Sequence, residues 1–341
     1  MSVTIKDVAK EVGVAPSTVS RTLKDHPSIS NETKERVRKA MDKLGYVPNV
    51  SAQNLANKYV NTIGVILPVT KSQESKNNPF HLEMLTAMSE EASRQKVTIA
   101  IASGETEEEL LNNVELMYRQ KRVDGFILLY SKEDDQILEY LVTKKVPFTI
   151  VGQPYKYHNE SNCVDNDNQL LGYTATKHLI EKGHEKIVFV TNNQTENFSK
   201  DRLFGYEKCM KEHGLEPFKE LSLITPESYA EFDTVFRENQ PTACVAIDDM
   251  FAIRLIQMIQ FLGFSVPDDV SVISFNNSIF TTLLHPYITS IDVNISELGK
   301  TAVQEFLLQL KEENSMKKRV IIPHRLIENE TVIKRGCNKN V

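Results

Sequence analysis

Apolar residues in the first 48 positions recur three or four residues apart in three short segments, the spacing of one face of a helix. A capping-box pattern at Thr4 opens the first segment, which ends at Gly13. Pro16 fits the first turn of the second segment. Ser30 can cap the third segment, which ends at Gly45. The pattern therefore predicts three short helices around one small apolar core.

From Thr62 onward the pattern changes, and short, nearly continuous apolar runs alternate with longer stretches of helical periodicity. Continuous apolar runs are typical of parallel strands that are buried on both faces of a sheet. We expect strands at 63–69, 97–102, 125–130, 148–151, 187–191, 244–247 and 270–275. We expect helices near 82–95, 107–120, 134–144, 168–181, 200–213 and 249–262. This alternation predicts two Rossmann-like halves.

The predicted fold class is an all-α helix-turn-helix head followed by an α/β body of two Rossmann-like lobes. The expected domains are the head at 1–48, a hinge helix and linker at 49–60, and the body at 61–341. After Ser290 the pattern adds a short strand, a helix at 296–310 and a strand at 319–322. Open parallel sheets bind ligands at the carboxyl ends of their strands, so the space between the lobes is the expected ligand site.

Charge divides the chain in the same way as the apolar pattern. Residues 1–58 hold 10 Lys and Arg against 6 Asp and Glu, whereas the remaining residues hold 30 against 40. A basic head on an acidic body is typical of a protein whose head contacts nucleic acid phosphates. The alternative is a small helical bundle with a solvated charged face. The second predicted helix favours DNA, because Ser17, Ser20, Arg21 and Lys24 face outward.

Other classes of function lack support in the sequence. The chain has no apolar leader and no run of about 20 apolar residues, so we expect a cytoplasmic protein without membrane contact. Four widely spaced cysteines predict reduced thiols rather than disulfides or a metal site. Hydrolase, metalloprotease and P-loop motifs are absent, so we expect no enzyme and no cofactor. We interpret His178 and His184 as structural.

Several motifs carry a resemblance to a known family. They are T-I-K-D-V-A at 4–9, T-V-S-R at 18–21, the V-R-K-A-M-x-x-L-G-Y-x-P-N run that ends at Asn49, and A-x-x-L-A at 52–56. The chain resembles the lactose/galactose repressor family of bacterial transcription regulators over nearly its whole length. The resemblance implies a homodimer on double-stranded operator DNA. One small head buries too little surface for tight specific binding, which points to a dimer independently.

The resemblance also implies how DNA is contacted. The second helix would enter the major groove, where Pro16 and Ser17 vary among relatives and Arg21 reads bases. Ala15 departs from the Ser that is frequent at this cap. A hinge helix would place Leu55 as a wedge in the minor groove. The expected DNA-binding residues are Thr4, Ile5, Pro16, Ser17, Thr18, Ser20, Arg21, Lys24, Asn49, Ala52 and Leu55.

In the body, the resemblance implies interleaved lobes like those of periplasmic sugar-binding proteins. Lobe 1 is expected at about 61–163 and 291–322, and lobe 2 at about 164–290 and 323–341. A small sugar effector would lie between them. The family's N-P-F-F segment corresponds to a motif in which His81 replaces the second aromatic residue, and Asn276 stands where many relatives have Asp. The expected effector-binding residues are Phe80, His81, Arg202, Asp248 and Asn276.

Two further features bear on the effector. The rings of Phe80, Tyr155, Phe198 and Phe275 lie near predicted strand ends, where a sugar could stack. The segments VGQPY at 151–155 and VDNDN at 164–168 are similar to those of maltose-operon repressors of Gram-positive bacteria. We therefore expect a maltose or maltodextrin repressor. The alternatives are a catabolite-control regulator activated by a phosphorylated carrier protein and a sugar-binding or transport protein.

Overall fold

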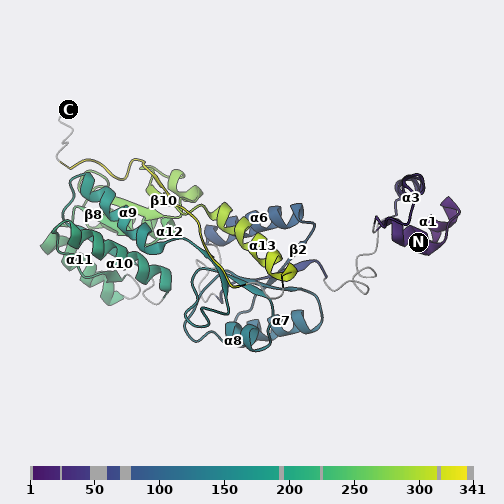
Figure 1. The fold of residues 1–341 in the computed structure, drawn as a ribbon. Helices are drawn as coiled ribbons and strands as arrows, with labels where there is room; N and C mark the ends of the chain where they lie inside the picture. The colour runs from purple at the N-terminus through teal and green to yellow at the C-terminus, as the bar shows by residue number, and fades with distance from the viewer. Residues whose placement is uncertain are drawn as a thin grey trace. The chain divides into compact units, whose positions relative to one another are not determined.

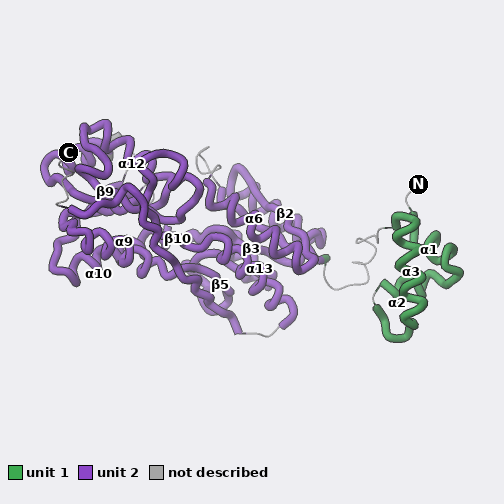
Figure 2. Tube along the Cα trace, turned by 90° about the horizontal axis from the view of Figure 1, so that it is seen from above, with its two compact units in different colours: residues 1–60 green, residues 61–341 purple. Residues whose placement is uncertain are grey.

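The computed structural model describes residues 3–23, 25–46, 60–69, 78–191, 196–222, 226–312 and 316–335. The chain forms two compact units, the head at 1–60 and the body at 61–341 (Figure 2). Each unit has its own apolar core. The predicted architecture of a helical head followed by an α/β body is confirmed.

The described part of the head contains three helices, α1 (Ile5–Val12), α2 (Pro16–Leu23) and α3 (Asn31–Leu44). The predicted helix ends are confirmed, because Ser30 Oγ accepts a hydrogen bond from Thr33 N, and Gly13 and Gly45 adopt left-handed conformations. The three helices bury a core of small aliphatic side chains, namely Val8, Ala9, Val12, Val19, Val37 and Ala40. Six partly buried apolar residues pack against this core, namely Val3, Ile5, Val14, Met41, Leu44 and Tyr46.

The first sheet of the body is entirely parallel and has the strand order β11-β5-β4-β3-β1-β2. Its strands are β1 (Thr62–Ile66), β2 (Thr98–Ala102), β3 (Gly125–Leu128), β4 (Phe148–Val151), β5 (Asn162–Asp165) and β11 (Arg319–Ile321). Figure 1 shows α6 and α13 together on one face of this sheet and α7 and α8 on the other. These helices are α6 (Pro79–Arg94), α7 (Glu107–Arg119), α8 (Gln136–Thr143) and α13 (Ile295–Lys311).

The second sheet has the order β12-β10-β9-β8-β6-β7, and only β12 runs antiparallel to its neighbour. Its strands are β6 (Ile187–Thr191), β7 (Leu221–Ser222), β8 (Ala243–Ala246), β9 (Ser271–Phe275), β10 (Thr289–Asp292) and β12 (Arg325–Ile327). Its helices are α9 (Asn168–Glu181), α10 (Asn197–Glu212), α11 (Pro226–Asn239), α12 (Asp249–Phe261) and the short 3-10 helix η1 (Ile279–Thr282).

The apolar pattern missed several elements. Strands β5, β7 and β12 are only two to four residues long, and α11 is mostly polar apart from Phe232 and Phe236, which are buried one turn apart. The short strand after 288 pairs with β9 of the second sheet, so it is not part of the tail that completes the first. The expected lobe boundaries at 163 and 290 each cut a strand that belongs whole to one sheet. The observed lobes are 62–165 with 295–321 (the first lobe) and 168–292 with 325–335 (the second lobe).

The chain crosses between the lobes three times, and one side chain joins the three crossings. The buried amide of Asn166 donates to Val293 O at 3.0 Å and to Ile322 O at 2.8 Å. These two carbonyls belong to the second and third crossings, and Asn166 belongs to the first. Buried carbonyls need such donors because they have lost their contact with water. Asn166 therefore links the three segments that connect the lobes.

Helices α9 and α10 approach each other unusually closely in the second lobe. A methyl group at Gly172 would lie 2.0 Å from Arg202 O, and one at Gly205 would lie 1.9 Å from Gln169 O. Only residues without a side chain allow two helix backbones to meet at this distance. The contact fixes the position of α10 and with it the side chain of Arg202.

Candidate functional site

The second helix of the head presents the predicted DNA-reading residues to solvent. Helix α2 begins at Pro16, and Pro16, Ser17 and Arg21 are exposed while Val19 is buried in the core. Thr18 and Ser20 are partly exposed. Ser17 and Arg21 are separated by four residues, so they share one face of the helix. This face combines a guanidinium fork with hydroxyl groups, which is chemistry suited to base edges and phosphates.

Other predicted DNA contacts have additional structural roles. The Thr4 hydroxyl donates to the Asp7 carboxylate at 2.6 Å, and Thr4 N donates to the same oxygen at 2.8 Å. Ile5 is half-buried and packs against the head core. Thr22 is buried and its hydroxyl donates to Thr18 O, a contact that the apolar pattern did not predict. Four of the predicted contacts lie outside the described residues, namely Lys24, Asn49, Ala52 and Leu55.

In the body, Arg202 of α10 is the centre of a cluster of charged and aromatic residues. Its side chain is buried, with 6% of its surface exposed. Its Nε donates to Asn168 Oδ1 at 3.0 Å and its Nη1 donates to Ile247 O at 2.8 Å. The guanidinium carbon lies 5.0 Å from the centre of the Phe198 ring and 4.4 Å from that of Phe275. Two rings and two hydrogen bonds thus hold the cation in one orientation.

The carboxylates of Asp248, Asp165 and Asp249 have the largest electrostatic effects on this guanidinium, and each favours its charged form. Asp165 and Asp248 each have a pKa raised to about 6 by burial, although the positive charge of Arg202 opposes that rise. Burial also raises the pKa of Asp249. Burial lowers the pKa of Arg202 to about 10, which leaves it charged at neutral pH. The cluster therefore carries more potential negative than positive charge.

The carboxylates come from strand and helix ends, as expected for an α/β ligand site. Asp165 is the last residue of β5 and accepts a hydrogen bond from Asn166 N at 2.8 Å. Asp248 caps α12 by accepting from Phe251 N at 2.7 Å, and the neighbouring Asp249 accepts from Ser278 N at 2.7 Å. Asn276 follows β9 with a left-handed φ of 90° and donates from its backbone to Ile291 O. These turns place all four side chains at the carboxyl edge of the strands.

The first turn of α6 provides the first-lobe side of the cleft. Asn78 caps this helix by accepting from Phe80 N at 3.0 Å, and the rings of Phe80 and His81 meet edge to face at 5.8 Å. Both residues are half-buried. Burial raises the pKa of Glu83 on the next residues of α6, and Asp292 and Asp249 of the second lobe raise it further. The charges of Asp292 and Asp249 in the second lobe therefore act on the start of α6 in the first lobe.

Sequence reasoning identified part of this cleft and missed the rest. The structure gathers Arg202 and Asp248 in one cluster, but the partners Asp165 and Asn168 were not predicted as site residues. Their signal was the polar Asp-Asn-Asp-Asn run that follows a short apolar strand at 165–168. Phe275 is fully buried against Arg202, so it is not a platform on which a sugar could stack. The polar loop at 71–77 lies outside the described residues.

The remaining chemistry of the described residues is modest. Within the described ranges, no group of three or more His, Cys, Asp or Glu side chains is arranged to hold a metal ion. None of the described helices is both long and apolar enough to cross a membrane. His184 has a structural environment, because its ring contacts Thr242 Oγ1 at 3.2 Å and Ile333 O at 3.0 Å. His178 is likewise buried.

Comparison with known proteins supports this division of the chain. Residues 4–49 match the model of bacterial regulatory proteins of the lacI family, and residues 176–332 match a periplasmic binding protein-like domain. The transcriptional regulator MalR of Streptococcus pneumoniae is 36% identical over 96% of this chain and 100% of its own length. Catabolite control protein A of Staphylococcus xylosus is 29% identical over 96% of this chain and 98% of its own.

A solved structure extends the comparison to three dimensions. The transcriptional regulator CelR in complex with cellobiose has a TM-score of 0.72 and 25% identity, and the match covers 97% of this chain and 100% of that one. The head motif, the two-lobed body and the full-length match to relatives all agree. The chain therefore belongs to the lacI family of bacterial regulatory proteins, and it is a DNA-binding transcriptional regulator.

Proposed function

We propose that this regulator represses an operon for the use of maltose or short maltodextrins, and that the sugar binds between the lobes and weakens operator binding. A probable maltose operon transcriptional repressor malR of known structure, 27% identical with a TM-score of 0.74, supports the operon. The CelR complex with cellobiose supports a sugar ligand for this body. The reading face of α2 would contact the operator. One head is small, with a core of six buried residues, and would bury too little surface on DNA for tight specific binding. We therefore propose a two-fold dimer on a pseudo-palindromic site.

The observation that carries the proposal is the chemistry around Arg202. Two of its donors are used within the second lobe, and Nη2 makes no hydrogen bond to any described residue. The negative charges of Asp248, Asp165 and Asp249 have the largest electrostatic effects on this guanidinium. One cation among three acids disfavours an anion but can both donate to and accept from hydroxyl groups. A neutral sugar is the ligand class that this arrangement fits best.

The proposed coupling to DNA follows from the two sides of the cleft. Arg202 and Asp248 belong to the second lobe, whereas Phe80 and His81 belong to the first. A ligand that contacts both sides favours one arrangement of the lobes over others. We propose that this arrangement is transmitted through the hinge at 49–60, where Leu55 and Ala52 would contact the minor groove.

The test is a titration of the full chain with operator DNA in the presence of a panel of neutral sugars. We expect maltose or a short maltodextrin to weaken operator binding. Thermodynamic linkage then requires operator DNA to weaken sugar binding by the same factor. Arg202→Met should remove sugar binding, whereas the neighbouring exposed Lys200→Met should behave like the unmodified chain.

Two results would contradict the proposal. One is calorimetry that shows no sugar binding to the intact chain. The other is sugar binding that operator DNA does not change. Either result would favour the alternative of a catabolite-control regulator that a phosphorylated carrier protein activates. Adding such a carrier protein to the operator titration would then strengthen DNA binding.

A further inference from the structure

Three lysines of the first lobe adopt a backbone conformation that normally belongs to glycine. Lys96, Lys121 and Lys145 follow the ends of α6, α7 and α8, and their φ angles are 58°, 53° and 53°. In each turn the amide of the next residue donates to the carbonyl five residues earlier, which is the Schellman motif. A left-handed conformation is unfavourable for any residue with a Cβ atom, so all three positions are strained.

Helices of the second lobe end with the same motif but mostly use glycine. Gly183, Gly214 and Gly263 follow α9, α10 and α12 with φ angles between 71° and 91°. The position after α11 is Gln240, with a φ of 49°. A Cβ atom at Gly214 or Gly263 would meet no atom within 4 Å outside its own turn, so lack of space does not require glycine there. Backbone conformation explains these glycines, and the lysines of the first lobe need another reason.

The three lysines lie along one edge of the first sheet. They precede β2, β3 and β4, and these strands and β1 are parallel, so their amino ends share one edge, here called the amino edge. The strand order in this part of the sheet is β4-β3-β1-β2. With about 4.8 Å between neighbouring strands, the row from Lys145 to Lys96 is about 14 Å wide.

The amino edge is basic, in contrast to the rest of the body. Its connections α6–β2, α7–β3 and α8–β4 hold five Lys or Arg against one Asp, whereas the helix-to-strand connections of the second lobe hold three against five. The one acid, Asp124, accepts a hydrogen bond from Thr62 N at 3.1 Å. The excess positive charge is therefore not balanced within these connections.

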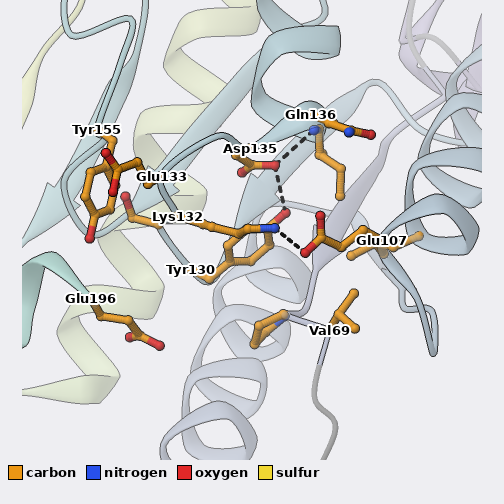
Figure 3. Close-up of a pocket in the computed structure, with 13 residues that line it drawn as sticks. Val69, Glu107, Tyr130, Lys132, Glu133, Asp135, Gln136, Tyr155 and Glu196 are labelled. Carbon is orange, nitrogen blue, oxygen red and sulfur yellow. Dashed lines mark hydrogen bonds and ion pairs between the residues drawn. The ribbon is translucent and has the colours of Figure 1, made fainter. Parts of the chain in front are cut away.

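The three lysines are also available for a partner. Lys96, Lys121 and Lys145 are exposed and form no ion pair with any described residue. At the carboxyl edge of the same sheet, by contrast, Lys132 forms an ion pair with Glu107 (Figure 3). Lysines at the two edges of one sheet thus differ, and those at the amino edge remain free to bind an anion.

The dipoles of the helices do not account for these lysines. A cation in the last turn of a helix favours the partial negative charge of the C-terminus. Helices α6 and α7 already have such a cation at a helical position, Arg94 and Arg119 respectively. A further lysine in a strained conformation is therefore not needed for this purpose after α6 and α7.

We propose that the amino edge is a second DNA-binding surface, which contacts backbone phosphates near the operator without reading bases. This surface goes beyond the proposed function because it acts without an effector. Lysine binds phosphate as a point charge on a flexible stem. Phosphates of one strand recur about every 3.4 Å along the DNA axis, so a row about 14 Å wide spans about four of them.

The chain itself keeps this edge within reach of DNA. Strand β1 begins at Thr62, and its amino end lies at the amino edge. Only residues 47–61 separate it from Tyr46, the last described residue of the head helices' unit before that stretch. Sixteen residue steps span at most about 55 Å. The amino edge is therefore tethered close to any duplex that the head binds.

The test measures binding of the full chain to an operator duplex and to a random-sequence duplex over a range of salt concentrations. A variant with Lys96→Gln, Lys121→Gln and Lys145→Gln should bind both duplexes at least about tenfold more weakly, and its slope of log K against log salt should fall by about 0.9 for each lost phosphate contact. The matched control carries the same substitution at three exposed lysines of α9 and α10, Lys177, Lys208 and Lys211. It should keep the affinity and the slope.

Glycine at the same three positions separates binding from stability. This variant should lose the same DNA affinity, while relief of the backbone strain raises the melting temperature of the body by about 2–4 °C for each position. A gain in stability together with a loss of affinity is the result expected of lysines that serve binding.

Three results would overturn the second surface. One is an affinity and a salt slope unchanged in both variants, which would leave the lysines as charges at helix ends. Another is an equal loss in the matched control, which would show an effect of net charge alone. The third is unchanged DNA binding with a lost response to a phosphorylated carrier protein, which would assign the amino edge to that partner. All measurements omit sugar, so the proposed function is tested separately.

Discussion

The head and the body place their candidate functional side chains in opposite environments. On α2 of the head, Ser17 and Arg21 project from a core to which they contribute nothing. In the body, Arg202 is 6% exposed, and its hydrogen bonds and ring contacts hold two helices and a strand end in place. Function and stability should therefore separate in the head and be coupled in the body. The difference follows from what each ligand offers, since DNA is a large external surface and the proposed sugar must be enclosed.

Arg202→Ala should produce the largest effect and would show the coupling in the body. It removes the only cation among three carboxylates and leaves Ile247 O without its donor. Leaving two buried acceptors, Asn168 Oδ1 and Ile247 O, without a donor costs about 1–3 kcal/mol for each. The lost packing of Arg202 against Phe198 and Phe275 adds to this loss. Chemical denaturation, monitored by a signal from the body, should show this loss of unfolding free energy. The effect of sugar on operator binding should disappear as well. A variant that keeps its full stability and loses only sugar binding would show that stability and function are not coupled in the body.

Asn166→Leu tests whether the Asn166 side chain, which joins the crossings between the lobes, contributes to stability as Arg202 does. The substitution leaves Val293 O and Ile322 O without a donor in a buried place, which costs about 1–3 kcal/mol for each carbonyl. Asn113→Leu is the matched control, because Asn113 makes the same type of bond to Ser103 O on the exposed surface. Equal melting temperatures for the two variants would show that Asn166 does not hold the crossings together.

Arg21→Ala tests the head side of the comparison. Because Arg21 is exposed, the unfolding free energy of the head should change by less than about 0.5 kcal/mol. Affinity for the cognate operator should fall by about 1–3 kcal/mol, while non-specific DNA binding stays nearly unchanged. Fluorescence anisotropy on both DNAs measures the two losses. Equal losses would make Arg21 a phosphate contact instead of a base reader.

Asp248→Asn should have the smallest effect, on the pH dependence of stability. The pKa of Asp248 is about 6 in the folded chain, above its ordinary value of 3.8, so the folded state binds more protons than the unfolded state between these values. Its contribution therefore lowers the unfolding free energy as pH rises from about 4 to about 6. Asn still caps α12 but does not titrate. The variant should therefore lose this dependence of the unfolding free energy on pH, which is on the order of 1 kcal/mol per pH unit.

The control for this experiment is a carboxylate with the opposite shift. Hydrogen bonds from Ser265 lower the pKa of Asp269, so Asp269 titrates below this pH window. Asp269→Asn should keep the slope between pH 4 and 6. Urea denaturation at several pH values compares the three proteins. An unchanged slope in Asp248→Asn would mean that this carboxyl is not held at a raised pKa.

Much of the fold was predictable because its signals are local. Ser30, Gly13 and Gly45 mark helix ends by chemistry within a few residues, and the apolar runs of β1, β3 and β8 mark buried strands. Elements with weak local signals were missed, such as the two-residue β7 and the largely polar α11. The strand at 289–292 was placed in the wrong sheet, because pairing with β9 depends on topology and not on its own residues.

The sequence by itself determined the division into a basic head and an acidic α/β body and the exposed polar face of α2. It also placed Arg202 on a helix and Asp248 directly after a strand. Tertiary structure alone decided that Arg202 lies between Phe198 and Phe275, that Asn166 joins three crossings, and that Glu107 faces Lys132. The physical reason is range, because capping and amphipathicity act over three or four residues. The contact of Glu107 with Lys132 joins residues 25 positions apart and that of Asn166 with Ile322 joins residues 156 apart, so these partners are set by how the two sheets pack.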